Sequence, residues 1–212
     1  MSPHRASLRE RKRVAMLEAL ERAAVELAAE HGYDHVTVEM ISEACMTSPR
    51  TFYNYLGSKE AAILGPRTPF ASPEQVERFV HERGPDVLVD FLSMVIDSLT
   101  ETPVDRELYQ LRQRVIYTTP ELSAKRLAID GELEARYRAV IAERFRAAGR
   151  LEATDAQLDD EAHMVIALAR GVLTYTAAKW YEPGFDRTVR ELIEDSIELV
   201  KRVLGDPSEP LD

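Results

Sequence analysis

Apolar residues recur at steps of three and four along most of the 212-residue chain, which is the spacing of one face of an α-helix. Between residues 9 and 31 the apolar positions on one such face are Val14, Leu17, Leu20, Ala24 and Leu27. Neither a strand-like alternation nor an internal repeat interrupts this spacing. The pattern therefore predicts an all-α protein.

Capping residues divide the first 64 residues into short helices. Gly32 is expected to end the first helix, because glycine readily takes the left-handed conformation found after helix C-termini. Thr37, Ser48 and Ser58 have side chains that cap helix N-termini, and each precedes a segment with helical spacing. Pro49 follows Ser48 at the first helical position, where its missing N–H is tolerated. Four helices are predicted in this part of the chain.

A segment rich in glycine and proline, residues 65–69, is expected to join this part to a second one. Further helices are predicted after it, approximately over residues 72–82, 86–100, 104–117, 120–148, 155–181 and 186–204. We therefore expect one domain at residues 1–64, a larger helical domain at 65–205 and a frayed tail at 206–212.

Charge is distributed unevenly along the chain. The net charge is −10, yet residues 1–13 contain five basic side chains and one acidic side chain. Residues 61–212 carry 19 basic and 28 acidic side chains. An acidic body repels DNA except where a basic segment lies, so this distribution favours nucleic-acid contact at the N-terminal arm.

Several functional classes are disfavoured by the composition. No apolar run reaches the roughly 20 residues of a membrane-spanning helix, and a single cysteine, Cys45, excludes an intrachain disulfide. These features suit a cytoplasmic protein without membrane partners. The chain has no nucleotide-binding glycine motif and no catalytic constellation, and Gly32 separates His31 from His35. We expect no enzyme activity, cofactor or metal site.

Two short capped helices in succession, the second beginning at Ser48, indicate a helix-turn-helix. In the second helix Arg50 and Asn54 are four residues apart and share a face away from the apolar Phe52. Arginine can bind guanine and asparagine can bind adenine in the major groove, so this pair is a candidate base reader. The hydroxyls of three neighbouring residues suit phosphate contacts, namely those of Thr51, Tyr53 and Tyr55.

The stretch Tyr33–Glu60, YDHVTVEMISEACMTSPRTFYNYLGSKE, resembles the signature of the TetR family of transcription regulators. The shared features are a Thr-capped second helix, a Thr-aromatic-aromatic recognition helix and a Ser-Lys-Glu opening of the fourth helix. The resemblance implies a recognition helix in the major groove and a lysine, here Lys59, that holds a phosphate. The predicted DNA-binding residues are Thr37, Ser48, Pro49, Arg50, Thr51, Tyr53, Asn54, Tyr55 and Lys59.

One position departs from the family pattern. The turn between the second and third helices usually contains glycine, whereas this chain has Met46. If the turn requires a positive φ, methionine is strained there. The geometry of this turn is therefore left open by the sequence.

The last two helices each have two apolar stripes, and a helix that is apolar on two sides must be covered on two sides. In the helix near residues 158–181 one stripe includes Ala162, Val165, Ala169, Val172, Thr176 and Trp180, and the other includes Met164, Leu168, Gly171 and Tyr175. We expect a homodimer in which two helices from each subunit pack together, as the resemblance also implies. The alternative is that both helices are buried in a monomer. The predicted interface residues are Val172, Trp180, Ile193, Ile197, Val200 and Leu204.

Aromatic and polar side chains in the middle helices form a candidate pocket for a small-molecule effector. The candidates are Phe91, Tyr109, Arg112 and Tyr137. Arg112 is flanked by leucines and valine, so it can pair with an acidic ligand or extend to the surface. The alternative for the aromatic residues is that they are ordinary core.

Together these features predict an N-terminal three-helix helix-turn-helix module that binds DNA, with a basic arm, and a larger C-terminal helical domain for dimerisation and ligand binding. The expected function is that of a ligand-responsive transcription repressor that binds a palindromic operator as a dimer, with repression taken from the resemblance. The alternatives are a helical adaptor that binds other proteins and, with less support, an all-α enzyme. The basic arm together with Arg50 and Lys59 favours DNA binding over the adaptor, because an adaptor has no need of charge placed in this way.

Overall fold

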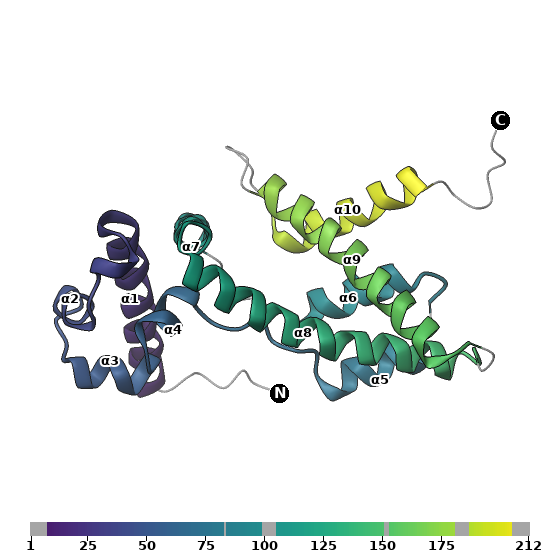
Figure 1. Cartoon of the computed structure of the whole chain (residues 1–212), viewed down its shortest axis with the longest axis horizontal. Coiled ribbons are helices and arrows are strands. Elements are labelled where there is room, and N and C mark those ends of the chain that lie inside the picture. The colour runs from purple at the N-terminus through teal and green to yellow at the C-terminus, as the bar shows by residue number, and fades with distance from the viewer. Residues whose placement is uncertain (1–7, 83, 99–104, 151–152, 181–186, 205–212) are drawn as a thin grey trace. The chain divides into compact units, whose positions relative to one another are not determined.

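The computed structural model of the chain describes residues 8–82, 84–98, 105–150, 153–180 and 187–204 (Figure 1). Every regular element in these ranges is helical, which confirms the predicted all-α class. The elements are α1 (Leu8–His31), the 3₁₀ helix η1 (Tyr33–His35), α2 (Val38–Ala44), α3 (Pro49–Leu56), α4 (Lys59–Leu64), α5 (Pro73–His81), α6 (Val87–Ser98), α7 (Arg106–Thr118), α8 (Pro120–Ala147), α9 (Asp155–Trp180) and α10 (Val189–Leu204). The predicted tail, residues 206–212, lies outside the described ranges. No helix within those ranges is long and apolar enough to cross a membrane.

The predicted N-caps are confirmed. The side-chain oxygens of Thr37, Ser48 and Ser58 each accept a hydrogen bond from a backbone N–H three residues later, at 3.3, 3.2 and 3.1 Å. Gly32 follows α1 with a φ of 83°, as expected of a glycine that ends a helix. The 3₁₀ turn after Gly32 was not predicted, since three residues are too few for a periodic signal.

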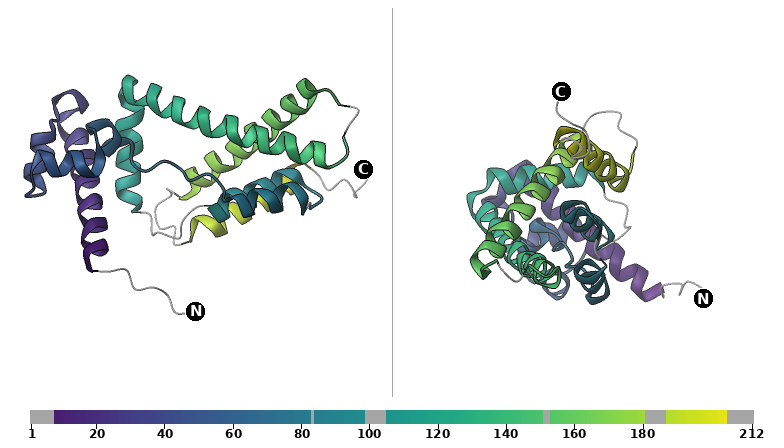
Figure 2. Two further views of the ribbon diagram at one scale, coloured as in Figure 1. Left: turned by 90° about the horizontal axis from the view of Figure 1, so that it is seen from below. Right: turned by 90° about the vertical axis from the view of Figure 1, so that its right-hand side faces the viewer.

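The described residues form two compact units. One comprises those within Met1–Arg67 and Pro103–Ile129, and the other those within Thr68–Thr102 and Asp130–Asp212. The first unit therefore contains α1–α4, α7 and the first turns of α8, and the second contains α5, α6, α9, α10 and the remainder of α8. Each unit has its own apolar core, and two further views of the helices are given in Figure 2.

The core of the first unit joins α1 to the helix-turn-helix and to α7. Leu20 of α1, Ile41 of α2, Phe52 of α3 and Ile63 of α4 are completely buried in it, and Ile116 of α7 is 1% exposed. Burial of each such side chain stabilises the fold by about 1.5–3 kcal/mol relative to exposure. The recognition helix is thus held by one buried aromatic side chain on its inner face.

The core of the second unit contains a cluster of aromatic rings contributed by α5, α6, α8 and the segment before α5. Phe91 and Tyr137 meet edge to face with ring centroids 5.2 Å apart, and Phe79 and Phe70 extend the cluster on either side. The Tyr137 hydroxyl accepts a hydrogen bond of 3.1 Å from the Ala71 N–H, which satisfies a buried polar group. These rings fill the space between the helices that carry them.

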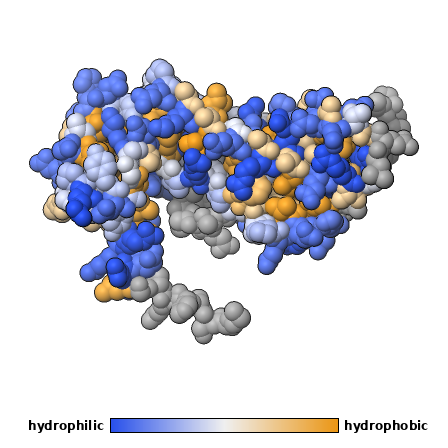
Figure 3. Space-filling view, turned by 60° about the horizontal axis from the view of Figure 1, so that its bottom comes forward, coloured by the Kyte–Doolittle hydropathy of each residue, from blue (hydrophilic) through white to orange (hydrophobic). Residues whose placement is uncertain are grey.

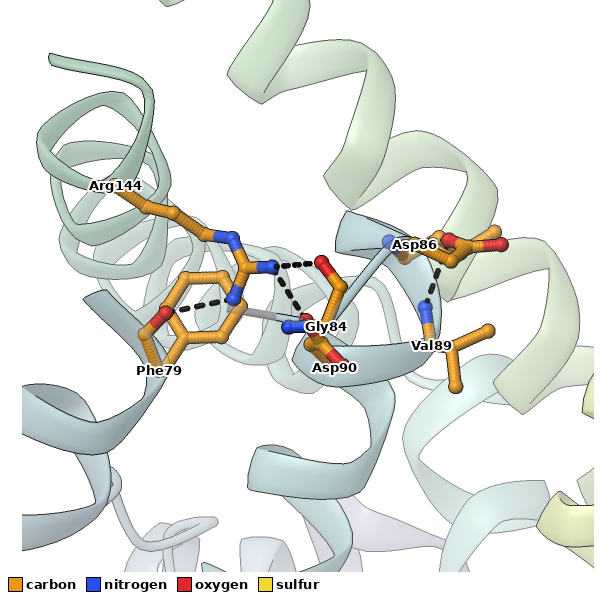
Figure 4. Close-up of polar contacts among 7 residues, drawn as sticks. Phe79, Gly84, Asp86, Val89, Asp90 and Arg144 are labelled. Atoms are coloured by element: carbon orange, nitrogen blue, oxygen red, sulfur yellow. Dashed lines mark hydrogen bonds and ion pairs between the residues drawn. The ribbon is translucent and has the colours of Figure 1, made fainter. Parts of the chain in front are cut away.

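A buried arginine of α8 forms a cluster of polar contacts in the second unit (Figure 4). The Arg144 guanidinium donates to the Phe79 carbonyl at 2.6 Å, to the Gly84 carbonyl at 3.3 Å and to the Asp90 carboxylate. It also lies 4.6 Å from the centre of the Phe79 ring. One side chain therefore binds the last turn of α5, the connection after it and the first turn of α6.

Met46 in the turn between α2 and α3 has a φ of 50° and is the single non-glycine residue with a positive φ in the described ranges. Its side chain is 95% exposed, so packing does not compensate for the backbone conformation. The sequence left the geometry of this turn open, and the structure shows that Met46 has the positive φ at which a methionine is strained. Side chains in the left-handed region raise the energy by roughly 1–2 kcal/mol.

Replacing Met46 with glycine should raise the free energy of unfolding by about 1 kcal/mol, because glycine adopts this conformation without steric strain. Urea denaturation of the two proteins measures the difference. The matched control is Ala61→Gly in α4, where the backbone is helical and glycine should lower stability by about 1 kcal/mol. A Met46→Gly protein that is less stable than the wild type would contradict the assignment of strain.

Candidate nucleic-acid interface

Helix α3 has one buried face and one open face. Phe52 is completely buried, whereas Arg50 and Asn54 are exposed. Within the part of the chain that the structure describes, neither Arg50 nor Asn54 forms a side-chain hydrogen bond or ion pair. Their donors and acceptors are therefore available to a ligand outside the chain. The two residues lie one helical turn apart on the same side of α3.

The other predicted DNA-contacting residues of the helix-turn-helix differ in how far they are engaged. The Ser48 hydroxyl caps α3 and lies 2.9 Å from the Thr51 hydroxyl. Tyr53 is 53% exposed and its ring packs edge to face on Phe52, with centroids 5.7 Å apart. Tyr55 is half-buried against the core of the first unit. The side chains with the greatest freedom to reach DNA are thus those of Arg50, Tyr53 and Asn54.

A groove of about 570 Å³ extends this surface towards the start of α1. It is lined by Leu8, Arg9, Lys12, Arg13 and Tyr55, so three basic side chains of α1 lie around one tyrosine of α3. In Figure 3 the first turns of α1, next to the grey N-terminal residues, are covered mainly by hydrophilic side chains. This arrangement of cations and a phenol suits an anionic backbone such as that of DNA. Residues 1–7 of the predicted basic arm lie outside the described residues.

Lys59 is positioned differently from the simple phosphate contact that the sequence suggested. Its ammonium donates to the Tyr33 carbonyl at 2.9 Å and to the Val36 carbonyl at 3.0 Å. It also lies 4.1 Å from the centre of the Tyr33 ring. Two of the three N–H groups therefore hold the connection between α1 and α2, and one remains for another acceptor.

The start of α4 and Tyr33 form one electrostatic group. Burial, together with the negative charge of Glu60, raises the pKa of the Tyr33 phenol to about 12. A hydrogen bond from Ser58 lowers the pKa of Glu60, which also accepts from the Tyr33 hydroxyl. Tyr33 is therefore neutral and Glu60 ionised at neutral pH. Sequence reasoning missed Tyr33, and the one available signal was an aromatic residue placed directly after the helix-ending Gly32.

The four predicted ligand-binding residues are not brought together in one unit. Phe91 and Tyr137 pack on each other in the aromatic cluster of the second unit. Tyr109 and Arg112 belong to α7 of the first unit, where Tyr109 is 37% exposed. Arg112 is buried and forms an ion pair with Glu21 at 2.9 Å. The expectation that Arg112 is open to an acidic ligand is therefore revised, because a carboxylate of α1 already occupies it.

Most of the predicted dimer residues lie inside a single subunit. Val172, Trp180, Ile193 and Ile197 are 9% exposed or less within a single chain. They belong to the interior of the subunit, because the faces of α9 and α10 that carry them pack on each other and on α6. Val200 is partly buried against the same core, and the side chain of Leu204 lies outside the description.

The second apolar stripe of α9 is the exposed one. Met164, Leu168 and Tyr175 are 60%, 44% and 43% exposed, and Ala167, Gly171 and Ala178 lie on the same open side. A Cβ added to Gly171 would meet no atom within 4 Å. Packing within the described chain therefore does not explain a glycine at this position.

These features define a helix-turn-helix protein whose second helix, α3, has one exposed polar face. Residues 21–63 match the family model for bacterial regulatory proteins of the tetR family. The chain is also 30% identical over 187 residues to the HTH-type transcriptional regulator TcmR from Streptomyces glaucescens, a match that covers 85% of this chain and 79% of TcmR. The chain belongs to the TetR family and is a DNA-binding transcription regulator. The family is one of regulators and not of enzymes.

The chain is also similar to solved structures of bacterial regulators. The fatty acid degradation regulator FadR from Bacillus halodurans is 18% identical, with a TM-score of 0.46 and coverage of 92% of this chain and 97% of FadR. The regulator PfmR from Thermus thermophilus is 22% identical, with a TM-score of 0.44 and coverage of 89% of this chain and 99% of PfmR.

Replacing Lys59 with methionine should lower the free energy of unfolding by about 1–3 kcal/mol, because two charge-assisted hydrogen bonds to carbonyl groups are lost. Urea denaturation at neutral pH measures this loss. The matched control is Arg50→Met, which removes an exposed cation without a partner and should change stability by less than about 0.5 kcal/mol. Equal stability of the two variants would contradict the role of Lys59 in holding the α1–α2 connection.

Proposed function

We propose that the chain represses transcription as a homodimer that binds a palindromic operator and releases it when a small molecule binds. In this proposal residues 1–64 contact DNA, residues 65–205 dimerise and receive the effector, and the protein acts in the cytoplasm. The observation that carries the proposal is the exposed Arg50–Asn54 pair, which has no side-chain partner among the described residues, on a recognition helix anchored by Phe52. A helix held in this way presents the same side chains to every operator.

Within α3 we assign base reading to Arg50 and Asn54 and backbone contact to the remaining residues. Arg50 and Asn54 have the donor and acceptor geometry for guanine and adenine edges. The hydroxyl of Tyr53, the remaining N–H of Lys59 and the basic groove beside Tyr55 suit phosphates. Thr37, Ser48, Pro49 and Thr51 are assigned to the DNA-facing end of the two helices, where caps and backbone N–H groups approach the phosphates.

Dimerisation is assigned to the exposed stripe of α9, together with the outer face of α10. Leu199 is half-buried and Val203 is 76% exposed, so α10 also has apolar side chains outside the subunit core. Small residues such as Gly171 allow a second helix to approach closely. A two-fold axis through this surface places the same stripe of both subunits face to face.

Effector binding is assigned to the aromatic cluster of the second unit. Phe91 and Tyr137 lie at its centre. An apolar or aromatic small molecule can bind there by taking the place of one ring and packing against the other. Effector binding shifts the population between a conformation that fits the operator and one that does not. The effect on operator affinity is set by the difference between the effector's affinities for these two conformations.

The assignment of base reading is tested by replacing Asn54 with alanine. The variant should lose discrimination at one or two base pairs, about 1–3 kcal/mol for a lost bidentate contact, while its non-specific binding is retained. The probes are a duplex selected by the wild-type protein from random-sequence DNA, single-base variants of that duplex and an unrelated duplex.

Tyr53→Phe is the matched control, because it removes a hydroxyl assigned to phosphate and should weaken all duplexes about equally. The assignment of roles is reversed if Asn54→Ala weakens every sequence uniformly while Tyr53→Phe changes base preference. Unchanged binding by both variants would exclude α3 as the DNA-reading helix.

The dimer surface is tested by Leu168→Glu. Leu168 is exposed within the subunit, so the variant should fold normally but place a charge in the interface and sediment as a monomer at micromolar concentration. Ala139→Glu on the exposed side of α8 is the control and should remain dimeric. A monomeric wild-type protein under the same conditions would contradict the dimer proposal.

A further inference from the structure

A buried ion pair joins α1 to α7 in the first unit. The Arg112 Nη2 lies 2.9 Å from the Glu21 Oε2, and the two side chains are 11% and 16% exposed. The Nε of Arg112 is also buried and has no hydrogen-bond partner among the described residues. Desolvating two charges and one donor is unfavourable, so apolar side chains of similar size give comparable stability more easily. Stability alone is therefore a weak reason for this pair.

The guanidinium of this pair also lies directly beneath the end of α4. Gly65 ends α4 with a φ of 72°, and its N–H donates to the Ala61 carbonyl at 3.0 Å. A Cβ built on Gly65 would overlap the Arg112 Nη1 and lie 2.5 Å from its Cζ. The backbone at the end of α4 therefore lies against the guanidinium, and a side chain at this position would displace the guanidinium from its place.

A second arginine holds the same end of α4. Arg126 of α8 donates from its Nη2 to the carbonyl of Leu64, which is the last residue of the helix. Two cations at the C-terminal end of a helix also interact favourably with its carbonyl groups. The position of the α4 C-terminus is therefore set by charged side chains from α7 and α8, although α4 itself has six residues.

Helix α4 in turn supports the recognition helix. Ile63 of α4 and Phe52 of α3 are both completely buried in the core of the first unit, and α4 packs against α1, α3 and α7. Because this core is close-packed, a displacement of α4 changes the support of α3. The Arg112 guanidinium thus contacts the end of α4, and α4 contacts α3, the proposed DNA-reading helix. The guanidinium itself contacts none of the residues proposed to bind DNA.

We propose that the Glu21–Arg112 ion pair beneath Gly65 is a positioning device that sets the place of α4 and, through it, the orientation of α3. Arg112 is accordingly a positioning residue for operator recognition and not an effector ligand. This inference rests on the proposed DNA-reading role of α3. It predicts that operator affinity depends on the pair even when the fold does not.

The experiment replaces both members of the pair in the full-length protein, Glu21→Met with Arg112→Met. Removing both charges avoids a lone buried charge, so the double variant should keep a thermal midpoint close to that of the wild type. Its affinity for the duplex selected by the wild-type protein from random-sequence DNA should fall about tenfold, the size of a typical coupling between sites. Its affinity for an unrelated duplex should change less than about twofold, since phosphate contacts remain.

Arg112→Lys provides a second test that keeps the charge opposite Glu21 but withdraws the planar guanidinium from beneath Gly65. This variant should also lose affinity selectively for the selected duplex. We expect a loss of about threefold to fivefold, which is the order of a weak coupling between two sites. The matched control is Arg22→Gln, which breaks the exposed ion pair between α1 and Asp105 before α7. Exposed pairs contribute little, so this control should bind both duplexes like the wild type.

The inference is overturned if either folded variant binds the selected duplex as tightly as the wild type. It is equally overturned if a variant loses affinity for both duplexes in the same proportion, which indicates a loss of folded protein. A wild-type protein that selects no sequence from random DNA contradicts the proposed function itself. The two failures are therefore distinguishable.

Discussion

The mode of DNA recognition proposed for this protein depends on how the eight-residue helix α3 is held. An isolated helix of that length is unstable in water, because the unfavourable free energy of forming the first turn exceeds the stabilisation from so few backbone hydrogen bonds. In α3 the Ser48 cap satisfies the first turn, and Phe52 fixes the inner face in a core shared with α1, α2, α4 and α7. Arg50 and Asn54 are exposed because the opposite face of α3 is held in this core, where Phe52 is completely buried. The proposed reading of DNA therefore depends on the packing of the inner face of α3.

Both compact units contain a buried arginine in a cluster where a charged side chain approaches a glycine closely. Arg112 lies against Gly65 in the first unit, and a Cβ there would overlap the guanidinium. In the second unit Arg144 binds Asp90, and a Cβ on Gly84 would lie 2.5 Å from the Asp90 carboxylate. Each glycine lets a charged group approach the backbone closely. Such contacts fix the ends of helices more sharply than apolar packing, because hydrogen bonds to a guanidinium have defined directions.

The features that were predictable from the sequence are those with local causes. Caps act within three residues, so Thr37, Ser48 and Ser58 could be assigned from the sequence. The departure at Met46 was visible in the sequence, but its positive φ required the structure. Lys59 binds carbonyl groups 26 and 23 residues earlier in the chain, and no local pattern carries that information.

The two apolar stripes of α9 are a second example of a feature that local sequence spacing does not settle. Helical spacing separates the stripe of Val172 from that of Leu168, but it does not indicate which stripe packs against α6 and α10. Arg112 was a similar case, since its partner Glu21 is 91 residues away. Pairing between distant segments is set by the whole core, so these assignments required the structure.

The central claim is that two copies of α3, related by two-fold symmetry, read one DNA site. Selection of bound duplexes from random-sequence DNA by the full-length protein, read by sequencing, tests it most directly. The account predicts an enriched palindrome whose half-site centres are separated by about 10 base pairs or a multiple of this, the repeat of the major groove on one side of the duplex. Enrichment of a single asymmetric half-site, or of no sequence, would contradict it.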